Sequence, residues 1–231
     1  MSDKIIVAIG GGEIKDKTTL KIDEHIAMLA KTRAGDKRAV ALFLGTASHD
    51  YMPYFNSFRK TYTSVFDIKA EVALTVYKKT EEDKLKEKFL SADMIYVGGG
   101  DTVFMLSDWK ENGITKLLKD AYERGVIIAG LSAGAVCWFE KMYTDSFSSG
   151  NGDKYSVYDG LGFLKGFACP HYNERAEDFD KLLVQEKQEA FCMENDAAIV
   201  FKNGTAAYSI SSGGKAYVAR AVGNSVIKTK L

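Results

Sequence analysis

The stretch GVIIAGLSAGAV, residues 125–136, joins a short apolar run to a serine that lies between small residues. Residues 125–130 have the length and composition of a buried strand, and a helix is expected after Ser132. A G-x-S-x-G turn between a strand and a helix holds its serine in a strained, exposed position. The stretch therefore predicts an α/β fold with a nucleophilic serine, and a serine that only caps the helix is the alternative.

The same strand-then-helix pattern repeats toward the N-terminus. Strands that are apolar throughout and separated by helices form a parallel sheet with helices on both faces. We therefore predict a three-layer α/β fold in a single domain spanning residues 1–231. A capping box at Thr80 and Asp83 is expected to open one helix. The expected strands are 4–9, 38–44, 68–76, 93–97 and 125–130, and the expected helices are 18–32, 53–62, 80–90, one ending near Trp109, and 114–124.

The C-terminal third has a different pattern. Strand-like pieces at 197–201, 205–210 and 215–222 are separated by NG at 203–204 and SSGG at 211–214. Short strands joined by such turns are typical of hairpins. We expect antiparallel hairpins at one edge of the sheet.

The composition excludes several classes of function. Lys and Arg together number 31, as do Asp and Glu, so the chain lacks the basic surface expected of a nucleic-acid-binding protein. No run of apolar residues is long enough to span a membrane. The three cysteines fit a reducing cytoplasm. We expect a cytoplasmic protein that acts on a small molecule and uses neither a cofactor nor a metal; its oligomeric state stays open.

A nucleophilic serine needs a base, and the sequence holds three histidines. His25 falls within an amphipathic helix and is expected to be structural. His49 follows the second strand and is the second choice. His171, in FACPHYNE, follows a short apolar strand, and Pro170 fixes the backbone just before it. His171 is therefore the best candidate.

A glycine-rich turn, GGGDT at 98–102, follows the fourth strand. Its backbone amides would approach a ligand closely, and one of them would join the amide of Ala133 in binding an oxyanion. The alternative is a tight turn in which Asp101 or Thr102 caps the next helix. Neither glycine triplet gives a dinucleotide-binding fingerprint.

Four stretches taken together, AIGGGEI, YVGGGDT, GLSAGA and CPHY, resemble the peptidase E (α-aspartyl dipeptidase) family of serine peptidases, which is related to cyanophycinase. The resemblance implies a fold similar to class I glutamine amidotransferase domains. It also implies that the substrate is a small peptide with an N-terminal aspartate, cleaved through an acyl-enzyme. Ser132 is then the nucleophile, His171 the base, and the amides of Gly100 and Ala133 the oxyanion donors.

The third member of the triad departs from the family pattern. In CMENDAAI, an ungapped alignment sets Asn195 opposite the family glutamate. We take Glu194 as the third member. Asp145, Asn195 and Asp196 are the alternatives, and Asn195 would orient the base as asparagine does in papain-like enzymes.

The segment expected to bind substrate departs as well. The family has a longer loop with an arginine suited to a carboxylate, and Arg175 is the residue that would replace it. The alternative is a surface ion pair between Arg175 and Glu177 or Asp178. Gly99 and Asp101 complete the expected substrate contacts.

Three other interpretations stay open. An α/β-hydrolase esterase would also use GLSAG, but its histidine follows its acid and lies near the C-terminus. A damaged triad would indicate a binding module without catalysis. A cysteine nucleophile would be Cys137 or Cys169, although both are expected to be packed in the interior.

Overall fold

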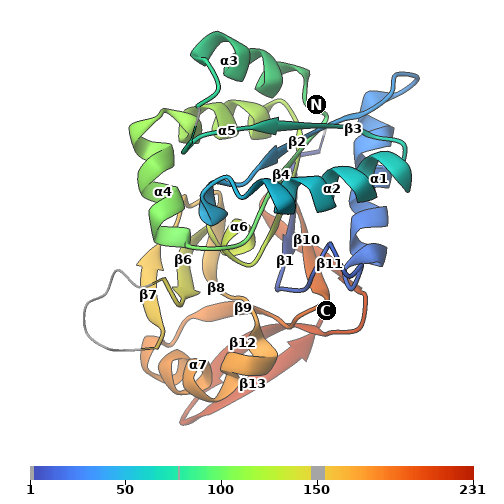
Figure 1. Cartoon of the computed structure of the whole chain (residues 1–231). Helices are drawn as coiled ribbons and strands as arrows, with labels where there is room; N and C mark the ends of the chain where they lie inside the picture. Colours follow the sequence, from blue (N-terminus) through green and yellow to red (C-terminus); the bar gives the residue numbers. More distant parts are fainter. Residues whose placement is uncertain (1–2, 78, 147–153) are drawn as a thin grey trace.

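The computed structural model describes residues 3–77, 79–146 and 154–231, which form helices around two β-sheets (Figure 1). The first sheet contains β1 (Ile5–Ile9), β2 (Val40–Leu44), β3 (Lys69–Ala73), β4 (Met94–Val97), β5 (Ile127–Leu131), β10 (Ala197–Lys202) and β11 (Thr205–Ser211). Its strand order is β11-β10-β1-β5-β4-β2-β3. Strands β1 to β5 pair in parallel, whereas β10 and β11 add antiparallel strands beside β1. The predicted parallel sheet with a C-terminal hairpin at its edge is therefore confirmed.

Helices cover both faces of this sheet, as the unbroken apolar strands predict. In β1, Val7 and Ile9 pack with the helices on one face, while Ile6 and Ala8 face the other side. All five residues of this strand are buried, which explains why it lacks polar alternation. On the first face lie α1 (Leu20–Ala34) and α2 (Met52–Ser64), and on the second lie α3 (Glu82–Ser91), α4 (Thr102–Glu111) and α5 (Ile114–Glu123).

The second sheet corrects one expectation. The strand expected at 215–222 does not extend the edge of the first sheet but pairs antiparallel with two strands of the second. The strand order of this sheet is β13-β12-β9-β8-β6-β7. A hydrophobic pattern identifies a strand but not its partner, because both sheets offer an apolar face. The strands are β6 (Phe139–Thr144), β7 (Ser156–Asp159), β8 (Leu164–Cys169), β9 (Glu189–Met193), β12 (Ala216–Val222) and β13 (Ser225–Lys230).

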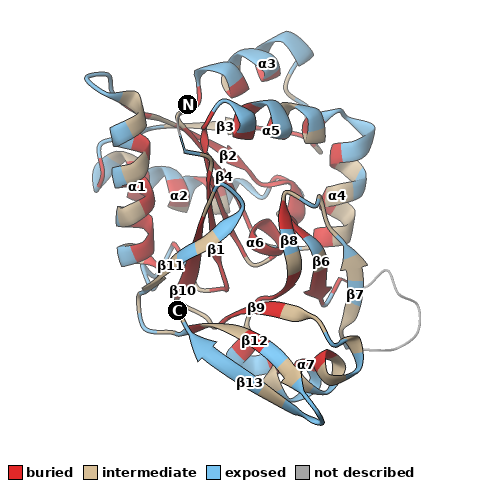
Figure 2. Ribbon diagram, turned by 180° about the vertical axis from the view of Figure 1, so that it is seen from behind, coloured by how far each residue is buried: buried red, intermediate tan, exposed pale blue. Residues whose placement is uncertain are grey.

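The two sheets share one hydrophobic cluster. Buried residues lie in strands of both sheets, for example in β1, β6 and β8 (Figure 2). The ring centroid of Phe201, on β10, lies 5.4 Å from that of Phe139 and 5.0 Å from that of Phe191, both on the second sheet. This shared core fixes how the second sheet sits against the first. A single domain for residues 1–231 stays a prediction.

Two local predictions differ from the structure. The helix after Ser132 is a single turn, α6 (Ala133–Val136), because the chain enters β6 at Phe139. The capping box at Thr80 is absent, since the Thr80 hydroxyl accepts a 3.0 Å hydrogen bond from the amide of Leu74 and α3 begins only at Glu82. Thr80 therefore fixes the loop before the helix. Within the described residues, none of the helices has both the length and the apolarity needed to cross a bilayer.

Candidate active site

Ser132 occupies a strained turn between β5 and α6. Its backbone has φ 53° and ψ −109°, a conformation that costs a residue with a side chain about 1–3 kcal/mol. The amide of Ser132 donates to the carbonyl of Ile9 at 2.9 Å, and the carbonyl of Ser132 accepts from Ala135 and Val136. Its hydroxyl caps no helix amide. The geometry is that of a nucleophile elbow, not that of a serine cap.

The two glycines of the G-x-S-x-G motif make this turn sterically possible. A Cβ on Gly130 would overlap the carbonyl oxygen of Gly134, and a Cβ on Gly134 would overlap that of Val97 in β4. The backbone therefore folds back on itself and packs directly against the neighbouring strand. Small residues at these two positions are a geometric requirement of the turn.

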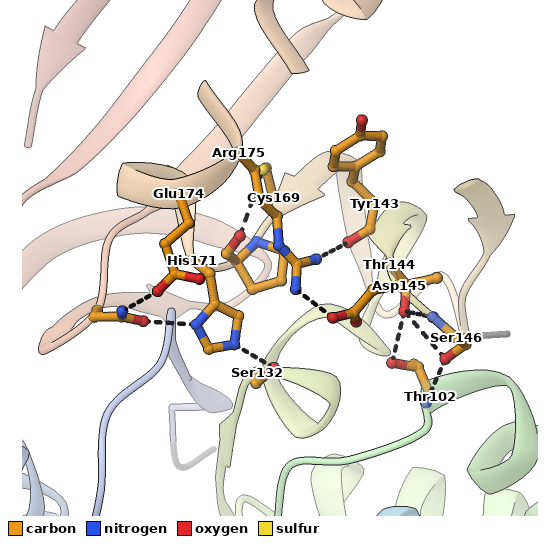
Figure 3. Close-up of polar contacts among 12 residues, drawn as sticks. Thr102, Ser132, Tyr143, Thr144, Asp145, Ser146, Cys169, His171, Glu174 and Arg175 are labelled. Carbon is orange, nitrogen blue, oxygen red and sulfur yellow. Dashed lines mark hydrogen bonds and ion pairs between the residues drawn. The ribbon is translucent and has the colours of Figure 1, made fainter. Parts of the chain in front are cut away.

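His171 is the histidine that the fold brings to Ser132 (Figure 3). It lies between β8 and α7 (Tyr172–Glu186), with φ 49° and ψ 39°. Its Nε2 atom is 2.8 Å from Oγ of Ser132, and its amide donates to the carbonyl of Gly10 at 2.9 Å. Two strands from different sheets thus deliver the hydroxyl and the imidazole to one point.

The other two histidines lie elsewhere. Nε2 of His25 is 2.9 Å from the hydroxyl of Tyr208, on the outer strand of the first sheet. The ring of His49 packs against Phe104, with centroids 4.1 Å apart. Neither ring contacts Ser132, so His171 alone supplies an imidazole to this hydroxyl.

Asn195 contacts the side of the His171 ring that faces away from Ser132. Its Oδ1 atom lies 2.6 Å from Nδ1 of His171, and its Nδ2 atom donates to Oε1 of Glu174 at 2.6 Å. The backbone amide of Asn195 donates to the side chain of Asn173 at 2.9 Å. The asparagine is therefore held at both ends, with its amide between the imidazole and a carboxylate.

The structure corrects the choice of Glu194. Its carboxylate accepts from the amide of Lys215 at 2.9 Å and from the hydroxyl of Tyr217 at 3.3 Å, away from the imidazole. Asp196 accepts from the hydroxyl of Thr18 at 2.5 Å instead. Neighbouring side chains leave the backbone in different directions, so only the middle residue of the three reaches His171.

Arg175 is also corrected. Its guanidinium is buried, with the residue 4% exposed, and it pairs with Asp145 at 3.1 Å. It also donates to the carbonyl of Tyr143 and lies 4.8 Å from the ring centroid of Tyr155. Arg175 therefore holds the loop that carries Asp145, and it serves neither as the expected substrate ligand nor in a surface pair on its own helix. Asp145 in turn is occupied by Arg175 and not by His171.

A cleft of about 490 Å³ opens above Ser132 and His171. Gly99 and Gly100 line it as expected, whereas Asp101 caps α4 by accepting from the amide of Phe104 at 3.0 Å. The rest of the lining comes from the loop after β1, from Tyr51 and α2, and from Leu131 of β5. The GGGE turn at 10–13 is the sequence signal for the loop, whereas the contribution of α2 was not predicted. These additional lining residues are Gly12, Glu13, Lys15, Tyr51, Pro53, Tyr54, Ser57 and Leu131.

The two amides expected to bind an oxyanion are free of protein partners. Within the described residues, neither Gly100 nor Ala133 donates its backbone N–H to another protein atom. Gly100 has φ +140°, and a Cβ there would overlap the carbonyl oxygen of Ala47, so no other residue fits. The amide of Gly100 is thus kept at the cleft by a turn that only glycine allows.

The model of one protein family matches residues 6–209, which is most of the chain, and that family is peptidase family S51. The chain belongs to peptidase family S51. An uncharacterized peptidase of Bacillus subtilis, YgaJ, is 34% identical over 221 residues, covering 93% of this chain and 91% of the relative. The resemblance to serine peptidases is therefore confirmed.

Solved structures agree on the fold of this S51 peptidase. A peptidase from an acI-B1 Actinobacterium superposes with a TM-score of 0.75 at 13% identity, covering 99% of this chain and 94% of the other. A candidate peptidase E protein from Listeria monocytogenes EGD-e gives a TM-score of 0.60 at 21% identity, with full coverage of both chains. At these identities the likeness concerns the fold alone.

The surroundings of His171 favour its neutral form. Burial lowers the pKa of His171 below its ordinary value of 6.5, and the nearby charge of Arg175 lowers it further. The hydrogen bond with Asn195 and the charges of Glu174 and Asp145 oppose this shift. A neutral imidazole retains a lone pair that accepts a proton.

The cysteines of the S51 peptidase are unsuited to nucleophilic attack. Cys137 and Cys169 are fully buried, and burial raises the pKa of each thiol well above its ordinary value. Cys169 donates to the carbonyl of Pro170 at 3.5 Å. Because the thiolate is the reactive form, the structure argues against both as nucleophiles.

Proposed function

We propose that this protein is a serine exopeptidase that hydrolyses small peptides with an N-terminal aspartate through an acyl-enzyme. The observation that carries the proposal is the 2.8 Å contact between Oγ of Ser132 and Nε2 of His171. This contact lies at a cleft that the glycine turn at 98–100 also lines. A hydroxyl paired with a neutral imidazole beside unused amides is the arrangement that acyl transfer requires.

The mechanism follows from these positions. Nε2 of His171 takes the proton of Ser132 as Oγ attacks the peptide carbonyl carbon, and the resulting oxyanion accepts from the amides of Gly100 and Ala133. Each such donor lowers the barrier by about 3 kcal/mol. His171 then protonates the leaving amine as the C–N bond breaks. A water then attacks the acyl carbon while His171 takes its proton; the bond between the acyl carbon and Oγ breaks, and His171 returns the proton to Ser132 as the acid product leaves.

The cleft supports a small charged substrate. Besides Ser132 and His171, the cleft lining includes the carboxylate of Glu13 and the ammonium group of Lys15. Glu13 would bind the α-ammonium group of the substrate, and Lys15 would bind the aspartate carboxylate. Lys15 takes this role because Arg175 is engaged with Asp145.

The esterase and binding-module alternatives are less well supported. Along the chain the order is Ser132, His171 and then Asn195, whereas α/β-hydrolases place the histidine last. An asparagine replaces the triad acid, which a binding module would also allow, but Oδ1 of Asn195 still lies 2.6 Å from Nδ1 of His171, so the imidazole keeps a hydrogen-bond partner. Membership of a peptidase family favours peptide substrates.

A dipeptide-library assay tests the proposal. We expect wild type to cleave Asp-X dipeptides, Ser132→Ala to lose all turnover, and a fluorophosphonate probe to label wild type but not the variant. Turnover by Ser132→Ala at the wild-type rate would overturn the assignment of the nucleophile. Cleavage of p-nitrophenyl esters but of no dipeptide would favour the esterase.

A second assay tests the aspartate preference. We expect Lys15→Gln to raise KM for Asp-X substrates and to leave Ala-X substrates unchanged. Lys17→Gln is the matched control, because Lys17 lies outside the cleft lining. Equal effects of the two variants on Asp-X substrates would remove Lys15 from substrate recognition.

A further inference from the structure

We propose that Glu174 is a positioning residue that fixes the side-chain amide of Asn195 and, through it, the tautomer of His171. This inference rests on the proposed function, since it concerns how the base is prepared. Three contacts form a chain: Ser132 to His171 at 2.8 Å, His171 to Asn195 at 2.6 Å, and Asn195 to Glu174 at 2.6 Å. Glu174 and Ser132 lie on opposite sides of His171 (Figure 3).

The direction of each hydrogen bond follows from Glu174. A carboxylate only accepts hydrogen bonds, so the NH₂ group of Asn195 must face Glu174. The carbonyl oxygen of Asn195 then faces His171 and also only accepts. Nδ1 of His171 must therefore carry the hydrogen. Nε2 is left with its lone pair toward the hydroxyl of Ser132, which is the tautomer that general-base catalysis needs.

Asn195 cannot select this tautomer alone. An asparagine amide has a donor and an acceptor of nearly equal size, and a flipped amide would donate to Nδ1. The hydrogen of the neutral ring would then sit on Nε2, which could not take the proton of Ser132. Glu174 excludes the flipped state, so the pair of Asn195 and Glu174 does what one carboxylate does in an ordinary triad.

The local structure fits this role. Asn173 and Glu174 lie in the first turn of α7, directly after His171, so one turn of helix places the imidazole and both partners of Asn195. The bond from the amide of Asn195 to Asn173 fixes where its side chain starts. The charge of Glu174 also favours the imidazolium that forms during catalysis.

A charge-relocation experiment tests the proposal. The glutamine of Glu174→Gln can donate as well as accept, so it permits the flipped amide of Asn195. We expect kcat to fall about 10-fold with KM unchanged. The acid limb of the pH profile should move to lower pH, because the charge of Glu174 raises the pKa of His171. In the double variant Asn195→Asp with Glu174→Gln, the carboxylate at position 195 accepts from both neighbours, and we expect kcat to return toward wild type. Glu177→Gln is the control, because Glu177 is exposed and pairs with Lys181 on the same helix.

The ¹⁵N chemical shifts of His171 report the tautomer without any turnover, and so separate this inference from the proposed function. We expect the hydrogen on Nδ1 in wild type and a mixture in Glu174→Gln. Finding the hydrogen on Nε2 in the wild type would overturn the proposal. So would a double variant no faster than Glu174→Gln. The proposed function would be refuted by a different result, namely peptide hydrolysis that persists in Ser132→Ala.

Discussion

Gly11 leaves the space in which His171 lies: a Cβ built on Gly11 would come within 2.5 Å of the imidazole. It would also overlap Oδ1 of Asn195. The carbonyl of Gly11 accepts from the amide of Asp196 at 3.0 Å, so the same residue holds the loop that carries Asn195. The turn after β1 is therefore a support for the imidazole and its partner.

Substituting Gly11 should disable the enzyme without unfolding it. We expect Gly11→Ala to push the imidazole off Ser132 and to lower kcat about 100-fold, because misplacement of a catalytic group by about 1 Å costs that much. Gly35→Ala is the control for backbone strain alone: a Cβ there meets nothing within 4 Å, but φ +64° disfavours alanine, so this variant should lose some stability and keep its kcat. Kinetics and thermal unfolding of both variants check this, and wild-type kcat in Gly11→Ala would contradict it.

The elbow should store strain that glycine releases. Ser132 holds φ 53° with a Cβ present. We expect Ser132→Gly to gain about 1 kcal/mol in the free energy of unfolding, because glycine tolerates this conformation. Ser132→Ala keeps the Cβ and should gain nothing, while both variants lack activity. Urea denaturation compares the two, and equal stabilities would show that the turn is unstrained.

The pH dependence should follow His171. Its pKa in the folded protein lies below 6.5, so the midpoint of the acid limb of kcat/KM should also lie below 6.5. In the unfolded chain the imidazole binds its proton at higher pH. Stability should therefore fall as pH drops from about 6.5 toward the lowered folded value, and His171→Gln should remove that part of the slope. An acid limb centred above 6.5 would mean that burial does not control this group.

Asp23 should give the opposite pH dependence: it lowers stability as pH rises, whereas His171 lowers it as pH falls. This buried carboxyl accepts from Thr19 at 2.7 Å and from Tyr62 at 3.0 Å, and burial raises its pKa from 3.8 to about 6. The folded state thus holds a proton that the unfolded chain releases, so stability falls as pH rises across this window. We expect Asp23→Asn to gain roughly 1–3 kcal/mol above about pH 7.

Urea unfolding at two pH values checks the effect of Asp23→Asn. The gain should vanish near about pH 4, where the carboxyl is protonated in the folded state. Asp36→Asn, an exposed site, is the control and should change little. An equal gain at both pH values would assign the effect to packing instead of titration.

The parallel strands of the first sheet could be predicted because their signals lie in short stretches of sequence. Five apolar runs bounded by turns correspond to β1 through β5, and the elbow motif needs only its own glycines to bend, as Gly130 and Gly134 show. Bounds shifted by a few residues where packing decided them; for example, the strand expected at 68–76 ends at Ala73. The second sheet could not be foreseen, because its strands pair across distant parts of the chain.

At the site, the local motifs were enough to predict Ser132 as the strained hydroxyl and to favour His171 over His49 as its partner. Which group contacts the far side of the imidazole depends on the packed fold. Glu194, Asn195 and Asp196 are adjacent in sequence, and the choice among them depends on how the loop is held by Gly11 and Asn173. Whether a side chain reaches His171 depends on its direction and its distance, and both are set only when the two sheets pack on their shared core.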